Sequence, residues 1–355
     1  MEKIKDLIEK IFDEENQIYP FKRKYISLSE NNNEIDVKID LGFVFKRLEE
    51  KYKKIIFKTL EPTKKSVKID FKLNVASHQT QAGTQNLKNV KNIIAVASGK
   101  GGVGKSTVAC NLAIALNKLG ARVGILDADI YGPSQPKMFG VSSKPESKDG
   151  KSMEPIEAHG IQTMSIGYLI DIDTPVVWRG PMVTNTLQQL LGETNWKDLD
   201  YLIIDLPPGT GDTQLTLAQK VPVTGSVIVT TPQDISLIDA QKGIGMFNKV
   251  NIPNIGLIEN MAVYECPNCG HHEHIFGSGG GERLAKKNNI ELLGSIPLKA
   301  HIQEDMDSGV PTLIKDNHIE IHGEFFSIAE KVSIRVAQIK ENFKDRFPKI
   351  VIQNN

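Results

Sequence analysis

The residues with the clearest chemical potential form a glycine-rich segment, SGKGGVGKST, at residues 98–107. Its glycines, lysine and serine fit the pattern G-x-x-x-x-G-K-[ST]. Glycine allows positive φ angles, so backbone N–H groups can converge on phosphate oxygens at the start of a following helix. The segment therefore predicts a nucleotide-phosphate site. Its expected members are Gly99, Lys100, Gly101, Gly102, Val103, Gly104, Lys105, Ser106 and Thr107.

Two of these side chains have defined roles in such a loop. The lysine that precedes the hydroxyl residue, Lys105, is expected to reach the β- and γ-phosphates of a nucleotide. The hydroxyl of Ser106 is expected to bind Mg²⁺. Because an apolar strand run precedes this motif and a helical pattern follows it, the context supports the prediction.

Carboxylate and amide side chains end three further apolar runs of the chain. Asp127 and Asp129 lie in ILDADIYGPS, Asp205 in YLIIDLPPGTGD and Asn260 in GLIENM. Ligands of open α/β sheets bind at the carboxyl ends of parallel strands, so these side chains are expected near the phosphates. Asp205 is expected to hold Mg²⁺ through water, and Asn260 could read a nucleotide base through its amide.

A pair of cysteines lies late in the chain, in ECPNCGHHEH. Thiolates suit zinc or an iron-sulfur cluster, and both usually take four protein ligands, but Cys266 and Cys269 supply two. The third cysteine, Cys110, is expected in the core of the helix after the glycine-rich loop. The pair could be completed by a histidine in a zinc knuckle, could act as a redox motif, or could join its symmetry mates in a dimer around one cluster. The histidines concerned are His271, His272 and His274.

Apolar strand runs alternate with helical segments from residue 92 onward, and this pattern predicts a doubly wound, mostly parallel α/β domain over 92–343. A small α/β unit is expected over 1–75, with helices near 2–14 and 44–57 and three strands. Residues 76–91 are polar and form a predicted linker, and 344–355 form a C-terminal tail. For Trp178 and Arg179, in VVWRGPM, packing is the default expectation.

Composition narrows the classes of partner. The chain has 43 Lys plus Arg and 43 Asp plus Glu, so no charge excess indicates nucleic acid or a membrane surface. No signal-like segment and no apolar run of membrane-spanning length is evident, which predicts a cytoplasmic protein. In that reducing compartment, paired cysteines more often bind metal than form a disulfide bond.

The second lysine of the loop gives it the K-G-G-x-G-K-[ST] form, which resembles the deviant Walker A motif of the MinD, ParA, ArsA and nitrogenase iron protein group. The resemblance implies that Lys100 crosses a homodimer interface to the partner's nucleotide. It also implies that Asp129 orients or deprotonates the attacking water, that Asp127 assists Mg²⁺, and that Asn260 recognises adenine.

Taken in order, GKGGVGKST, LDADIYGPS, WRGPM, DLPPGTGD, TTPQD, ENM and CPNCGHHEHIFGSGGGERLA resemble the Mrp/ApbC family of iron-sulfur cluster carrier ATPases. The resemblance spans roughly residues 92–340, and residues 1–75 resemble a divergent, cysteine-free MIP18-like domain. It implies a homodimeric ATP hydrolase that uses ATP and Mg²⁺, shares a labile [4Fe-4S] cluster between the Cys266 and Cys269 pairs of two subunits, and passes it to apo-proteins. A MinD/ParA-like positioning ATPase and a zinc-bridged dimeric ATPase are the alternatives.

Overall fold

The computed structural model describes residues 1–15, 21–31, 33–81, 84–170, 180–316 and 319–342. Within this part of the chain two sheets form, one of three strands and one of nine. The strands of the larger sheet are β4 (Val90–Ala97), β5 (Val123–Asp127), β6 (Ile156–Ala158), β7 (Ile161–Ser165), β8 (Leu199–Asp205), β9 (Gly225–Thr230), β10 (Asn254–Glu265), β11 (His272–Glu273) and β12 (Glu291–Leu298).

The larger sheet is mostly parallel. Its order is β11-β10-β9-β4-β8-β5-β7-β6, and β12 also pairs with β10. Within the described part of this sheet, only β6 with β7 and β10 with β11 pair antiparallel. Since β4, β5 and β8 are parallel neighbours, their carboxyl ends meet at one edge.

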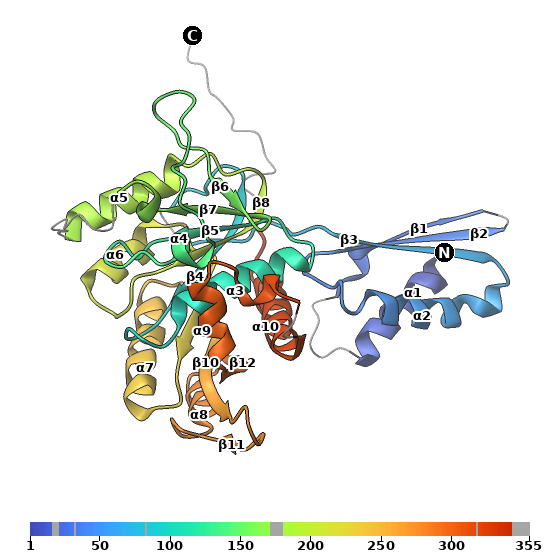
Figure 1. Cartoon of the computed structure of the whole chain (residues 1–355). Coiled ribbons are helices and arrows are strands. Elements are labelled where there is room, and N and C mark those ends of the chain that lie inside the picture. Colours follow the sequence, from blue (N-terminus) through green and yellow to red (C-terminus); the bar gives the residue numbers. More distant parts are fainter. Residues whose placement is uncertain (16–20, 32, 82–83, 171–179, 317–318, 343–355) are drawn as a thin grey trace, which may run out of the picture.

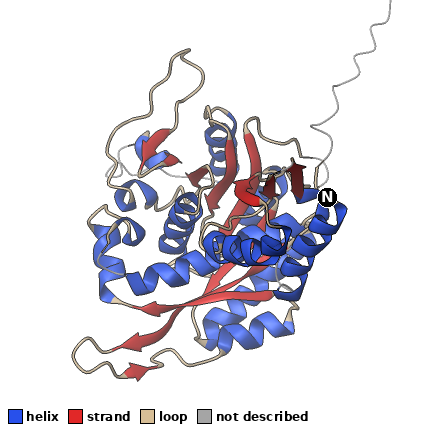
Figure 2. Ribbon diagram, turned by 90° about the vertical axis from the view of Figure 1, so that its right-hand side faces the viewer, coloured by secondary structure: helices blue, strands red, loops and turns tan. Residues whose placement is uncertain are grey.

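Helices cover both faces of this sheet (Figures 1 and 2). Strand residues alternate between two apolar clusters, as Ile93 and Ile94 of β4 do, because successive side chains of a strand point to opposite faces. One cluster contains residues of α3, α9 and α10, and the other contains residues of α5, α6, α7 and α8. The predicted doubly wound architecture is confirmed. The helices are α3 (Lys105–Lys118), α4 (Gln135–Met138), α5 (Gly180–Gly192), α6 (Asp212–Lys220), α7 (Asp234–Lys249), α8 (Gly280–Lys287), α9 (Ala300–Asp307) and α10 (Ile319–Gln338).

The N-terminal unit places two helices against one side of its small sheet (Figure 1). Its second helix begins at Glu49, five residues later than the sequence predicts, because Phe43, Val44 and Phe45 are buried in non-helical backbone. The elements are α1 (Glu2–Glu15), β1 (Ile26–Glu30), β2 (Glu34–Leu41), α2 (Glu49–Leu60) and β3 (Ser66–Leu73). Short 3₁₀ turns occur at Arg23–Tyr25, Glu61–Thr63, Ile166–Tyr168 and Thr312–Ile314.

The two units share their apolar cores at α10. Ile334 and Ala337 of this helix belong to the N-terminal cluster, whereas Val44 and Val75 belong to the cluster of the large sheet. The backbone N–H of Val44 donates to the hydroxyl of Ser333 at 3.2 Å. The N-terminal unit is therefore packed against the larger one through α10.

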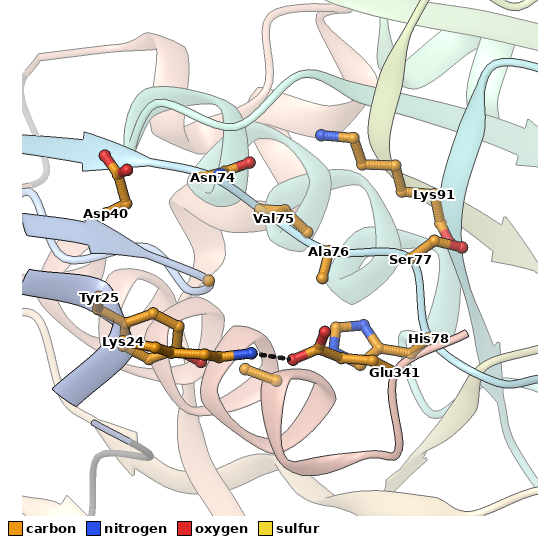
Figure 3. A pocket seen from close by; sticks show the side chains of 12 residues that line it. Lys24, Tyr25, Asp40, Asn74, Val75, Ala76, Ser77, His78, Lys91 and Glu341 are labelled. Carbon is orange, nitrogen blue, oxygen red and sulfur yellow. Dashed lines mark hydrogen bonds and ion pairs between the residues drawn. The ribbon is translucent and has the colours of Figure 1, made fainter. Parts of the chain in front are cut away.

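A cavity of about 450 Å³ lies at the same junction (Figure 3). Two of the residues that line it, Lys24 and Glu341, form an ion pair of 2.9 Å. His78 lies beside this pair, and its pKa is lowered because it is buried. Residues 77–79 pair with 340–342 there through two backbone hydrogen bonds, so part of the predicted linker is held in place.

Two sequence expectations fall outside the described residues, namely those for Trp178 and Arg179 and for the 344–355 tail. Within the described part, no helix has both the length and the apolar character needed to cross a bilayer.

Candidate functional site

The glycine-rich segment forms the turn between β4 and α3. Gly102 and Gly104 both have a φ of 80°, a left-handed conformation that favours glycine. A side chain at Gly104 would overlap the amide of Asn260, and one at Gly99 would overlap the backbone of Asp239 in α7. The loop therefore needs glycine at both positions, which is the geometry of a phosphate-binding loop at a helix N-terminus.

Lys105 lies at the centre of this loop. It is 6% exposed, and its ammonium forms an ion pair with the carboxylate of Asp205, which is fully buried at the end of β8. The same ammonium donates to the Ser106 hydroxyl at 3.2 Å. The structure thus brings together the three residues that the sequence assigned to phosphate and Mg²⁺.

Asp127 is also fully buried and lies beside this ion pair. Its oxygens accept hydrogen bonds from the backbone N–H groups of Asp129, Ser134 and Gln135 at 3.0 to 3.1 Å. Burial, helped by the nearby charge of Asp205, raises the pKa of Asp127 to about 7 in spite of these donors. Burial also raises the pKa of Asp129, and the charge of Lys105 opposes that shift.

The second lysine of the loop, Lys100, lies near α7. Its ammonium donates to the side-chain oxygen of Gln233 at 3.4 Å, just before that helix begins. Large apolar side chains are exposed on the next turns of the helix, where Ile235 is 69% and Ile238 is 58% accessible. Lys100 therefore lies close to an apolar surface that is exposed to solvent in the single chain.

Asn260 lies at the loop. Its amide donates to the carbonyl of Val103 at 2.8 Å, so it fixes the loop from β10, which is separated from β4 by β9. The predicted role in reading adenine stays a prediction, since the base site is not defined by this contact.

Gln135, the first residue of α4, was missed by the sequence reasoning. Its side-chain N–H donates to Asp205 at 2.9 Å and to the carbonyl of Ser106 at 3.1 Å. Its side-chain oxygen is buried and has no partner among the described residues. The available signal was its place in GPSQP, in the loop that follows the strand ending in Asp127.

These groups fit a magnesium-bound nucleotide. The Ser106 hydroxyl and the Asp205 carboxylate, which both contact Lys105, are oxygen groups of the kind that Mg²⁺ prefers, directly or through water. The unpartnered oxygen of Gln135 is an acceptor for a bound water in the same place. The glycine loop and Lys105 supply the donors that phosphate needs.

The cysteine pair lies in a tight turn between β10 and β11, on a hairpin at the lower end of the domain (Figure 2). The backbone N–H of Cys266 donates to the carbonyl of His271 at 2.9 Å, and that of Gly270 donates to the carbonyl of Cys266 at 2.9 Å. The N–H groups of Asn268 and Cys269 point at the Cys266 sulfur and lower its thiol pKa. The turn therefore makes the Cys266 thiol more acidic than an ordinary cysteine.

Among the described residues, no group of three His, Cys, Asp or Glu side chains could hold a metal ion. The cysteine pair therefore has no third ligand from the described part of its own chain. The His274 ring is hydrogen-bonded to the carbonyl of Ala262 at 3.0 Å. Nε2 of His272 lies 3.9 Å from a carboxylate oxygen of Glu265. This geometry does not favour a zinc knuckle within one chain.

Cys110 lies apart from this turn, as expected. It is fully buried in α3 within the large apolar cluster, and burial raises its thiol pKa.

The fold and the loop define a P-loop NTPase whose loop carries a second lysine. A family model described as ParA: NUBPL iron-transfer P-loop NTPase matches residues 89–333. The chain belongs to this family, which confirms the resemblance seen in its motifs.

Similar proteins with established names agree with this family assignment. The iron-sulfur cluster carrier protein of Pseudomonas fragi is 62% identical over 253 residues, 71% of this chain and 88% of the relative. That of Escherichia coli K12 is 56% identical over 271 residues, 76% and 73% of the two chains.

A solved structure of a nucleotide-binding protein from Archaeoglobus fulgidus in complex with ADP is also similar. It is 40% identical with a TM-score of 0.58, and the match covers 67% of this chain and 93% of that one. The cell division ATPase MinD of Pyrococcus furiosus, 20% identical with a TM-score of 0.51, shares the fold.

Proposed function

We propose that this chain is an ATP-hydrolysing iron-sulfur cluster carrier. Two copies hold one labile [4Fe-4S] cluster between their Cys266 and Cys269 side chains and pass it to apo-proteins. The observation that carries this proposal is the cysteine turn, which activates one thiolate and offers two ligands per chain. A [4Fe-4S] cluster takes four thiolates, so a second copy completes the set. The names of the curated relatives support the same cargo.

The surface near Lys100 supports the homodimer. Tyr131, Ile235 and Ile238 are exposed apolar side chains on segments next to the nucleotide site. Burying them against a second copy would remove apolar area from water at roughly 25 cal/mol per Å². In that assembly the Lys100 ammonium leaves Gln233 and reaches the partner's phosphates.

For hydrolysis, Lys105 and the loop N–H groups bind the phosphates, and Asp129 orients the attacking water. Bound Mg²⁺ supplies charge neutralisation at the phosphates, held by Ser106 and, through water, by Asp205. The Lys105→Ala variant is expected to lose nucleotide binding, whereas Lys100→Ala and Asp129→Ala keep binding and lose turnover. Equal turnover in the Lys100 variant would refute its role across the interface.

The test of the cargo is metal analysis of protein prepared without oxygen, together with its mass in solution. We expect about two irons and two sulfides per chain in a dimer, with absorption near 400 nm. The Cys266→Ala variant is expected to lose both. Zinc in place of iron would favour the zinc-bridged alternative, and unchanged iron in the Cys266 variant would rule out this turn as the cluster site.

A further inference from the structure

Helices α4 and α9 pack on each other between the nucleotide site and the cysteine turn, with Gln135 bonded at one end and Lys299 at the other. We propose that Gln135 and Lys299 are the positioning residues at the two ends of this route, through which the state of the nucleotide site sets the position of Cys266. This inference rests on the proposed function, because it assumes that both sites are used. It assigns a role to residues that touch neither the cluster nor the reacting phosphate.

At the nucleotide end the route begins with Gln135. This side chain is 1% exposed and bonds both Asp205 and the backbone of Ser106. Its own backbone N–H donates to Asp127 at 3.0 Å. When the Lys105 ammonium moves from Asp205 to a phosphate, the Gln135 amide faces a changed charge, and its unpartnered oxygen allows it to turn. Gln135 therefore couples the charge at Asp205 to the start of α4.

In the middle of the route α4 rests on α9. Lys137 and Asp307 form an ion pair of 3.3 Å between the two helices. Just beyond, Gly140 and Gly309 bring their backbones together so closely that a side chain on either would overlap the other. A backbone-to-backbone contact contains no flexible side chain that could absorb a shift, so α9 is expected to follow α4.

At the cluster end the route finishes at Lys299, the residue that precedes α9. Its ammonium forms an ion pair with Glu265, the last residue of β10 and the neighbour of Cys266. Glu265 also lies opposite His272 in the pairing of β10 with β11. Because α9 is about 12 Å long, a shift at its far end reaches the backbone of Lys299 with little loss, and the ion pair passes it on to Glu265. Lys299 therefore ties the cysteine turn to α9.

The ammonium of Lys299 has a second set of carboxylates available. It lines a cavity of about 250 Å³ together with Glu265 and with Glu320 and Glu324 of α10. In this structure it pairs with Glu265, and the two α10 carboxylates offer an alternative partner across the same cavity. Two discrete arrangements of one element are what coupling between distant sites requires. Release of Glu265 would free the cysteine turn.

The experiment measures how fast cluster-loaded protein gives up iron to a chelator, without nucleotide and with a non-hydrolysable ATP analogue. We expect the two rates of the wild-type protein to differ by at least about fivefold, the lower end of ordinary coupling. In Lys299→Met and Glu265→Gln the ratio falls toward one, while iron content and analogue binding persist. Gln135→Met, at the nucleotide end of the route, lowers the same ratio. The matched controls Lys286→Met and Glu304→Gln, both on exposed helix positions, keep the wild-type ratio.

A purely structural role for the Lys299 pair would change both rates alike and leave their ratio intact, and that result would overturn the inference. Linkage supplies an independent readout: if the analogue changes the equilibrium affinity for the cluster, the cluster changes the Kd of the analogue by the same factor, which analogue binding to loaded and cluster-free protein would measure. A wild-type ratio of one in protein that binds both cluster and analogue also overturns the route, while the carrier function stands. Absence of iron from the wild-type protein removes the carrier function and the route together, so the two failures are distinguishable.

Discussion

Replacing Lys105 by Met should destabilise the protein even without nucleotide. The substitution removes the ammonium that pairs with the fully buried Asp205 and whose charge also stabilises the ionised form of the fully buried Asp127. Removing one partner of a buried pair typically lowers the free energy of unfolding by about 3 to 5 kcal/mol. The matched control is Lys100→Met, which loses a single contact of 3.4 Å and is expected to lose less than about 1 kcal/mol.

The destabilisation should depend on pH with a definite sign. Burial already raises the pKa of Asp127 to about 7, and loss of Lys105 raises it further. The folded variant then binds more protons than the unfolded chain, whose carboxyls titrate near 4, so its unfolding free energy increases as the pH falls. Between about pH 8 and about pH 7 the variant should recover up to about 1.4 kcal/mol relative to the wild type, because the wild-type Asp127 is still ionised there, whereas below about pH 7 both proteins bind this proton.

The assay is urea unfolding followed by circular dichroism at both pH values. The double variant Lys105→Met with Asp205→Asn should recover part of the loss, because it no longer buries the second charge. A loss below about 1 kcal/mol at the higher pH, or the same loss at both pH values, would show that the buried carboxylates are not held by Lys105.

Three further outcomes are expected. Binding of magnesium ATP should release a proton below about pH 7, because a cation near Asp127 lowers its raised pKa. Calorimetry in buffers of different ionisation enthalpy measures this release, and equal binding heats in all buffers would contradict it. Iodoacetamide should modify Cys266 with a pH midpoint below that of an ordinary thiol and leave Cys110 unmodified until unfolding, as peptide mass mapping would show. Gly104→Ala should lower the free energy of unfolding by about 1 to 3 kcal/mol, and Gly101→Ala, whose backbone is unstrained, by clearly less.

The strands and the phosphate loop could be predicted from the sequence because their signals are local. The apolar runs of the central strands β4, β5, β8 and β9 are buried on both faces, and the loop is a contiguous motif. The cysteine pair is evident from the sequence for the same reason, and Pro267, Asn268 and Gly270 favour the turn that it forms.

The features that sequence reasoning missed depend on distant neighbours. The start of α2 was placed too early because Val44 is held by Ser333, 289 residues away, in backbone that its own neighbours do not specify. The hairpin of β6 and β7 was not predicted, because its short strands carry a weak alternation and are completed by pairing with β5. Gln135 and Lys299 gain their partners only when α4 and α9 pack.

The sharing of α10 between the two cores sets an order of assembly on the ribosome. The N-terminal unit is synthesised first, yet Ile334 and Ala337, which complete its core, are among the last described residues to emerge. Domains usually fold as units in order of synthesis. Here the first unit is expected to stay incomplete until α10 appears, so a nascent chain arrested before residue 334 should remain sensitive to protease in residues 1–75.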